Sequence, residues 1–277
     1  MGVLVDFKAD LHCHSTYSDG SLHPKALLEL ALANGLQGIS ITDHDTVEAY
    51  LDNELFTSPV HVIPGAEFTT THRGSRIHAL AYSFSLNDPR ILDLSKVHKI
   101  RRDERIREMA ALLRKEGFDI DIEKILEKVK MPGRPHLAMA LLEKGVVKDL
   151  KEAFDKYIGD EKKCFVKSHA ISTEETLAIL KKAKAIPVIA HPHLIKENKV
   201  VKDLLKMDFE GIEVFYANFQ KSSCEKWLRF AQNKKWLATG GSDFHGDSKT
   251  YIALGASYTP KETFQKLMTR YEENKLS

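Results

Sequence analysis

The sequence predicts an α/β fold of parallel strands that is interrupted once by a helical insertion. Over most of the 277 residues, short apolar runs alternate with stretches of helical periodicity, which is typical of a parallel α/β architecture. Between about residues 94 and 164 this alternation stops, and helical patterns follow one another directly. The length suits one large domain that carries an insertion.

Seven apolar runs are the candidate strands, and nearly all of them lead into His, Asp or Glu. Their short length, β-branched content and flanking turn residues favour buried strands over helices. The runs cover residues 7–11, 38–42, 61–66, 75–84, 185–190, 211–215 and 236–242. In barrel-type α/β folds, functional residues gather at the carboxyl ends of such strands. We therefore expect the polar residues that follow the runs to converge.

Helical patterns fill the gaps between the strands and make up the whole insertion. Between the strands they cover residues 24–34, 173–184, 200–207, 222–233 and 261–274. In the insertion they cover residues 96–116, 121–129 and 135–143, each with an apolar face. We predict a body made of residues 1–94 and 165–277, and an inserted helical domain, residues 95–164, that caps the substrate site.

Composition narrows the class of protein. Lys and Arg number 41 against 39 Asp and Glu, so the net charge of +2 gives no bulk attraction for nucleic acid. No apolar run approaches the roughly 18 residues of a membrane-spanning helix, and the N-terminal residues lack the apolar region of a signal peptide. Cys13, Cys164 and Cys224 are too far apart for a CxxC zinc site, and their use fits a reducing cytosol. A cytoplasmic protein is expected.

The 13 histidines fall largely at the ends of the apolar runs. His12 and His14 are two apart, so in an extended chain they share one face and can grip one ion. Asp10 is placed to orient one of these rings, and Glu67 can bridge two cations. Further candidates for the same site are Asp19, His44, His78, His191, Asp243 and His245. Mixed imidazole and carboxylate ligation suits zinc, manganese or iron, and hydrolysis is the default chemistry for several such ions.

The segments DLHCHSTYSDGS, ITDHDT, PGAEFT, IHALAY, AHPH and GGSDFH, in that order, resemble the motifs of the polymerase and histidinol phosphatase (PHP) family. The resemblance spans residues 10–245 and implies a distorted (β/α)7 TIM-like barrel with three divalent metal ions, Mn²⁺, Zn²⁺ or Fe²⁺. It assigns one ion to His12, His14, Glu67 and Asp243, a second to Glu67, His78 and His191, and a third to Asp19, His44 and His245. Asp19, Glu67 and His245 are the candidate catalytic residues.

The segment MPGRPHLA, residues 131–138, resembles a Gly-Arg-Pro-His segment of the TrpH-like branch of that family. Members of this branch remove the 3′-phosphate from nucleoside 3′,5′-bisphosphates, and some degrade short RNA from the 5′ end. Arg134 offers a planar fork suited to phosphate and precedes a helix start, although a capping or surface arginine is the alternative. His136 is a second phosphate-binding candidate, or else a cap. His193 stands where the family often has Gly; it is a candidate substrate contact, a further ligand, a proton donor or a bystander.

Two other features have both a functional and a structural interpretation. The basic stretch of residues 96–107 could meet the phosphates of RNA, but its interleaved acids favour a solvated helix face for all except Arg101 and Arg102. Tyr17, Phe215 and Tyr216 could stack on a base, whereas core packing is the commoner fate of such residues.

The sequence thus predicts in-line hydrolysis of a nucleotide phosphomonoester, with a nucleotide or short RNA as substrate and phosphate as product. A histidinol-phosphatase-type enzyme is the alternative within the same family, and a non-catalytic metal-binding module is the alternative from another class. No membrane contact is expected. The oligomeric state is left open, with a monomer as the default.

Overall fold

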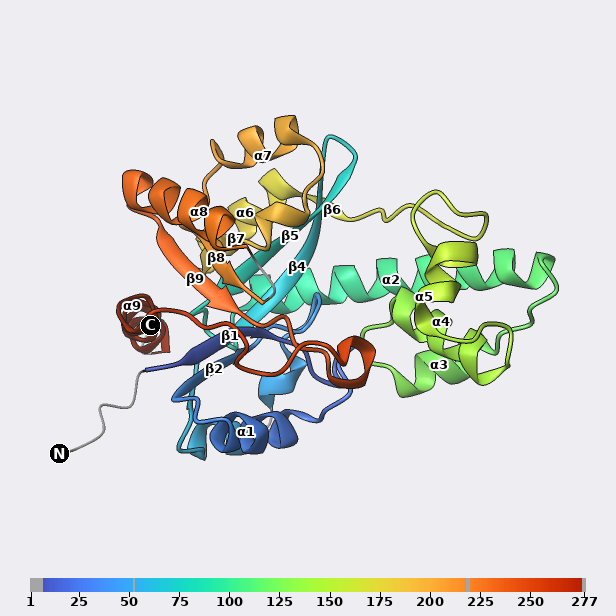
Figure 1. The fold of residues 1–277 in the computed structure, drawn as a ribbon, viewed down its shortest axis with the longest axis horizontal. Helices are drawn as coiled ribbons and strands as arrows, with labels where there is room; N and C mark the ends of the chain where they lie inside the picture. Colours follow the sequence, from blue (N-terminus) through green and yellow to red (C-terminus); the bar gives the residue numbers. More distant parts are fainter. Residues whose placement is uncertain (1–6, 52, 218–219, 276–277) are drawn as a thin grey trace.

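The computed structural model describes residues 7–51, 53–217 and 220–275 and contains two sheets (Figure 1). The smaller sheet is parallel, in the order β1 (Ala9–Cys13), β2 (Gly38–Ile41), β3 (His61–Val62). The larger sheet has the order β6 (Ile171–Ser172), β4 (Gly65–His72), β5 (Ser75–Tyr82), β7 (Ile186–Ile189), β8 (Gly211–Tyr216), β9 (Leu237–Gly241). The fold is α/β, as predicted.

The larger sheet is mixed rather than wholly parallel. β5 pairs antiparallel with both β4 and β7, while β7, β8 and β9 are parallel to one another. The predicted run 61–66 is divided between β3 and β4, because Pro64 has no N–H to donate to a ladder. In consequence Glu67 lies inside a strand of a hairpin, not at a strand end as predicted. His78 lies inside β5, within the run 75–84 that was predicted as a strand.

Isolated bridges join the two sheets at more than one place. Cys13 bridges to Phe244 after β9, and His44 after β2 bridges to Glu67 in β4. Across the described residues the strands form no continuous closed sheet, so the seven-stranded barrel remains a prediction. The bridges nevertheless bring the ends of β1, β2 and β9 beside β4, which is what positions the site.

Helices cover the outside of the sheets and build the insertion (Figure 1). The body carries α1 (Pro24–Ala33), α6 (Thr173–Lys182), α7 (Asn198–Leu204), α8 (Lys221–Lys234) and α9 (Lys261–Lys275). The insertion contains α3 (Ile122–Lys128), α4 (Arg134–Glu143) and α5 (Leu150–Ala153), followed by one π-helical turn over Phe154–Ile158. The sequence pattern missed α5, which is too short to show periodicity. Within the described part of the chain, no helix is both long and apolar enough to cross a membrane.

Helix α2 (Pro89–Lys115) connects the body to the insertion. It begins at Pro89 rather than near residue 96, because the Asp88 carboxylate accepts a hydrogen bond from the Arg90 amide and caps the first turn. Ile91 near its start packs in a core of the body. Further along, Ile106, Met109 and Leu113 pack in a separate core of the insertion. The 27-residue helix therefore fixes the position of the insertion relative to the body.

Tyr50 joins strands β2 and β4 through one buried hydroxyl. This hydroxyl accepts hydrogen bonds from the amides of Ile41 (2.9 Å) and Gly65 (3.1 Å) and lies 2.7 Å from the Ile41 carbonyl. Because the side chain is buried, water cannot replace these bonds.

We expect Tyr50→Phe to lower the free energy of unfolding by about 1–3 kcal/mol, since it leaves buried amides unpaired. Chemical denaturation measures this change. Tyr258→Phe, at an exposed tyrosine, is the matched control and should have little effect. Equal stabilities for the two variants would contradict this role of Tyr50.

Candidate metal centre and adjoining cavity

Glu67 lies at the centre of a buried cluster of imidazoles. Its carboxylate lies within 3.5 Å of five histidine rings that come from different segments of the chain. Oε2 lies 3.4 Å from His12 Nε2, 3.3 Å from His14 Nε2 and 3.0 Å from His44 Nδ1, and Oε1 lies 2.8 Å from His78 Nδ1 and 2.9 Å from His191 Nε2. The predicted convergence of these residues is present in the structure, although their roles as ligands remain predictions.

Two aspartates extend the cluster. Asp243 Oδ1 lies 3.2 Å from His14 Nε2 and 3.5 Å from both His12 Nε2 and His245 Nδ1. Asp19 Oδ1 lies 3.4 Å from His245 Nε2, and its Oδ2 lies 3.7 Å from His44 Nε2. All nine predicted metal ligands are thus in one place.

The atoms form three groups that can each hold an ion. These are His14, Asp19, His44 and His245; His12, His14 and Glu67; and His44, Glu67 and His78. The grouping differs from the one implied by resemblance in that His14 and His44 each belong to two groups. The short distances around Glu67 allow neighbouring ions to share ligands.

Unpaired polar atoms indicate that the cluster is built for cations. His12 Nε2, His14 Nε2, His44 Nδ1, Glu67 Oε2, His78 Nδ1 and His191 Nδ1 are buried and have no hydrogen-bond partner among the described residues. Buried polar atoms without partners are costly and uncommon. Imidazole and carboxylate donors facing one another fit divalent transition metals, which would satisfy these atoms.

The charge states of Glu67 and His78 suit metal binding as well. Burial alone would raise the pKa of Glu67, but the nearby His78 and His44 outweigh it and hold the pKa well below its usual range. Burial lowers the pKa of His78 to about 4, so its ring stays neutral. Deprotonated carboxylates and neutral imidazoles are the forms that bind metals.

Glu213 supports the cluster from behind and was missed in the sequence. It lies in β8 and is fully buried. Its Oε1 accepts a hydrogen bond from His12 Nδ1 at 2.8 Å, and its Oε2 accepts one from the His191 amide at 2.7 Å. A carboxylate behind a ligating imidazole fixes its tautomer and orientation. A single acid inside an otherwise apolar strand was the available signal.

Asp243 has comparable support. Its Oδ2 accepts hydrogen bonds from Tyr216 Oη and from Lys249 Nζ, each at 2.7 Å, which leaves Oδ1 facing the histidines. Tyr216 therefore positions an aspartate rather than offering a free face for a base. Asp10, expected to orient a ring, instead accepts hydrogen bonds from the amides of His12, Ser242 and Gly255.

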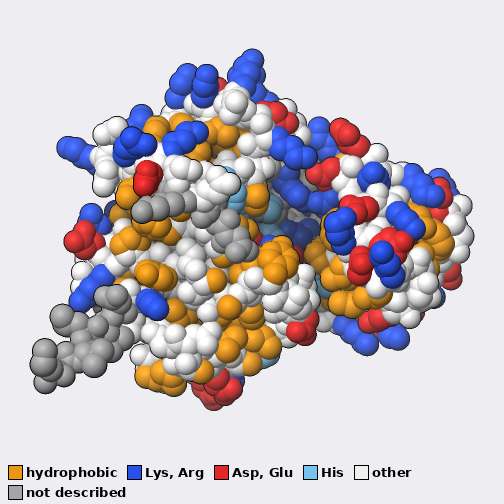
Figure 2. All heavy atoms as spheres, viewed as in Figure 1, with side chains coloured by type: hydrophobic (Ala, Val, Ile, Leu, Met, Phe, Trp, Pro, Cys, Tyr) orange, Lys and Arg blue, Asp and Glu red, His pale blue; other side chains and the backbone are white. Residues whose placement is uncertain are grey.

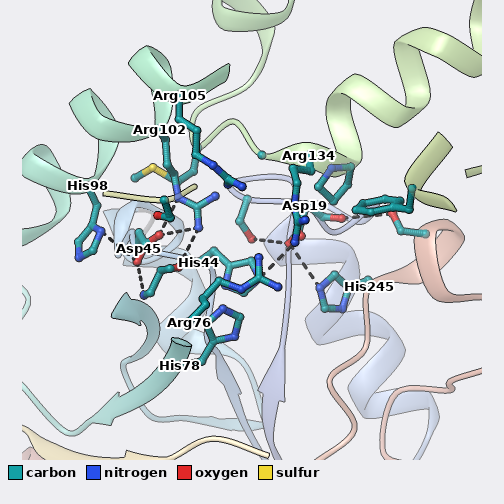
Figure 3. Close-up of a pocket in the computed structure, with 18 of the residues that line it drawn as sticks. Asp19, His44, Asp45, Arg76, His78, His98, Arg102, Arg105, Arg134 and His245 are labelled. Atoms are coloured by element: carbon teal, nitrogen blue, oxygen red, sulfur yellow. Dashed lines mark hydrogen bonds and ion pairs between the residues drawn. The ribbon is translucent and has the colours of Figure 1, made fainter. Parts of the chain in front are cut away.

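A cavity of about 500 Å³ opens from the cluster toward the insertion. Figure 2 shows this hollow between the body and the insertion, with Lys, Arg and His side chains inside it. At one end it is lined by Asp19, His44, His78 and His245. Arg76, Arg101, Arg102, Arg105 and Arg134 line it as well, and Figure 3 shows how four of them lie around the cluster.

The arginines are held in place to different degrees. Arg102 donates to Asp45 (2.6 Å), Thr69 (3.1 Å) and the Pro132 carbonyl (3.1 Å). Arg134 is buried and donates to Asp160 at 2.7 Å. Among the described residues, Arg76 has no hydrogen bond or ion pair.

These cations crowd one another, and burial together with the charge of Arg134 lowers the pKa of both Arg76 and Arg105. An anion in the cavity would relieve this repulsion.

Several other residues that were predicted to contact substrate have structural roles instead. His136 Nδ1 accepts a hydrogen bond from the Gly133 amide at 3.0 Å and so closes the first turn of α4; it does not line the cavity. The ring of His193 lies 4.6 Å from that of Tyr216, outside the cavity lining. Tyr17 and Phe215 pack against core clusters. In the basic stretch, Arg105 lines the cavity along with Arg101 and Arg102, contrary to the solvated-face interpretation.

The fold and the buried cluster define a metal-binding α/β protein with a basic cavity beside its metal centre. Comparison with known proteins gives the family. The model of the PHP domain matches residues 10–159. A 5′-3′ exoribonuclease of Haemophilus influenzae is 30% identical over 249 residues, which is 86% of this chain and 90% of that protein. A 3′,5′-nucleoside bisphosphate phosphatase of Chromobacterium violaceum is 28% identical, covering 85% and 86% of the two chains.

A solved structure agrees. A protein of Bifidobacterium adolescentis, provisionally described as a metal-dependent phosphoesterase, superposes with a TM-score of 0.86 and 27% identity over 95% of this chain and 96% of that one. The chain belongs to the PHP domain family.

We expect Glu213→Gln to weaken metal binding by about 10- to 100-fold, because the amide carries no charge and has a single acceptor oxygen for two partners. Competition with a chromophoric chelator measures the affinity. Glu210→Gln, at the residue directly before β8, is the control. If Glu213→Gln binds metal as tightly as the unmodified protein, Glu213 does not support the cluster.

Proposed function

We propose that this protein is a metal-dependent phosphoesterase that removes the 3′-phosphate from nucleoside 3′,5′-bisphosphates and cleaves short RNA from the 5′ end. One observation carries the proposal: the histidine and carboxylate cluster opens directly into a cavity lined by five arginines. Such a site can take one phosphate at the metals and a second phosphate on the arginines. The relatives named above act on substrates of this kind.

The residues divide the work of the reaction between them. Divalent ions held by the cluster would supply Lewis-acid activation of water and of the phosphoryl group. Glu67, Asp19 and Asp243 hold the negative charge that binds those ions. Arg76 and Arg134 offset negative charge on the substrate oxygens. The burial of Glu67 and Asp243 keeps bulk water away from these carboxylates, which strengthens their interaction with the ions.

The finer parts of the proposal follow the sequence prediction. The centre holds three ions, Mn²⁺, Zn²⁺ or Fe²⁺, on the nine predicted ligands, and Asp19, Glu67 and His245 are needed for catalysis. The strands form the wall of a distorted (β/α)7 barrel, and residues 95–164 cap the substrate. The Arg134 segment is supported by its place in the cavity lining, whereas His136 and His193 serve only indirectly. The protein works in the cytoplasm.

A histidinol-phosphatase activity fits less well. Its substrate carries a cationic amino alcohol, and the crowded arginines of the cavity would repel that group. A non-catalytic module is disfavoured by the complete set of converging ligands.

We expect chelation to abolish hydrolysis of adenosine 3′,5′-bisphosphate and added Mn²⁺ to restore it. Glu67→Ala and Asp19→Ala should lower kcat/KM by more than the roughly 100-fold typical of outer-shell partners. Phosphate release measures the rate, and exposed Glu54→Ala is the control. Full activity of the metal-free protein would overturn the mechanism.

We expect Arg76→Ala to raise KM for adenosine 3′,5′-bisphosphate about tenfold, because a charged hydrogen bond contributes about 1.5–3 kcal/mol. The KM for adenosine 3′-monophosphate should change much less. Arg73→Ala, in the same hairpin but paired with Asp203 outside the cavity, is the matched control. If Arg76→Ala raised KM equally for both substrates, Arg76 would not bind the second phosphate.

A further inference from the structure

Tyr251 is an exposed aromatic side chain that the fold itself does not use. It lines the cavity and yet exposes 73% of its surface, whereas aromatic side chains generally pack in the core. It lies outside the segments that carry the family resemblance, and it is not one of the aromatic residues considered for base stacking from the sequence. Its exposure at the cavity makes it a candidate contact for a ligand.

The backbone that carries Tyr251 is fixed against the metal centre. The preceding 3₁₀ turn, Gly246–Lys249, begins directly after His245. Ser248 Oγ donates to the Asp19 carbonyl, and Lys249 Nζ donates to Asp243. The Ile252 amide then donates to the Lys249 carbonyl at 3.0 Å. Tyr251 therefore lies on a short segment that is anchored to two candidate ligands, so its backbone has a fixed position relative to the cluster.

The insertion supplies an apolar wall to the same cavity. Leu150 and Phe154 line it from α5 and the turn that follows, Met131 lines it from the segment before α4, and Pro135 lines it from the first turn of α4. Phe154 also lies 5.5 Å from the guanidinium of Arg134, which joins this wall to the arginines. In Figure 1 the segment around residue 250 reaches toward the insertion. The cavity thus has candidate metal ligands at one end, arginines along its wall, and an apolar wall that the insertion supplies.

We infer that Tyr251 and the facing wall of Leu150, Phe154 and Met131 form a nucleobase subsite, which holds the base of a substrate whose phosphates lie on the metals and the arginines. This inference rests on the proposed function and adds what recognises the base. A nucleoside bisphosphate fits a cavity of about 500 Å³. An aromatic face accepts every base, because each base has a π-face, whereas the wall offers few polar groups to read base edges. Little base selectivity is therefore expected, beyond a preference for the larger purines.

The test compares adenosine 3′,5′-bisphosphate with ribose 3,5-bisphosphate, which has the same phosphates and no base. In the unmodified protein the base should improve kcat/KM. In Tyr251→Ala the ratio of kcat/KM values for the two substrates should fall about tenfold, as expected for the loss of one stacking contact. Tyr251→Phe and Tyr251→Trp should keep the ratio. Tyr258→Ala, at an exposed tyrosine outside the cavity lining, is the matched control.

The outcomes separate this inference from the proposed function. If Tyr251→Ala lowers kcat/KM equally for both substrates, or changes neither, the base does not bind there and the inference fails, while phosphatase activity stands. If the unmodified protein hydrolyses neither bisphosphate with Mn²⁺ present, the proposed function itself fails.

Discussion

The burial of the Glu67 carboxylate is the constraint on which the rest of the site depends. A charged group in the interior is stable only with compensating charge. The neighbouring His78 ring, whose pKa is lowered by burial, does not supply it, and divalent cations held by the cluster would. The backbone of Glu67 is hydrogen-bonded at both polar groups, because its amide donates to the Asp43 carbonyl and its carbonyl accepts from the Asp45 amide. One residue thus joins the two sheets and centres the metal cluster.

The segment Asp43-His44-Asp45 shows how sequence neighbours can serve three different purposes. The Asp43 carboxylate accepts hydrogen bonds from Ser15 and Ser18 and so shapes the loop that carries Asp19. His44 turns into the metal cluster. Asp45, whose φ of 60° bends the chain, is bonded by Arg102 of α2. Folding of the cluster, of the Asp19 loop and of the cavity wall is therefore coupled through three consecutive side chains.

Much of the site could be predicted because its motifs follow the ends of strands. This rule holds for His44, His191 and His245, which leave β2, β7 and β9. It fails for Glu67, which lies inside β4, since the extent of this strand depends on hairpin pairing with β5 that an apolar run does not encode. Glu213 was missed for a related reason. Whether an acid inside a strand faces solvent or a ligand is decided by register, which tertiary packing sets.

The cavity could not be predicted from motifs, because its walls come from elements that meet only through α2. This helix packs in the body near its start and in the insertion near its end, and three of its arginines line the space between. The candidate metal ligands then all come from the body, and much of the remaining cavity wall comes from α2 and the insertion. Such a division lets the insertion vary and change the substrate while the buried cluster, with its many shared partners, stays the same. The start of α2 at Pro89, rather than near residue 96, therefore has a structural consequence. The capped first turn anchors the helix to the body, and this anchoring sets the distance between the candidate metal ligands and the arginines of α2.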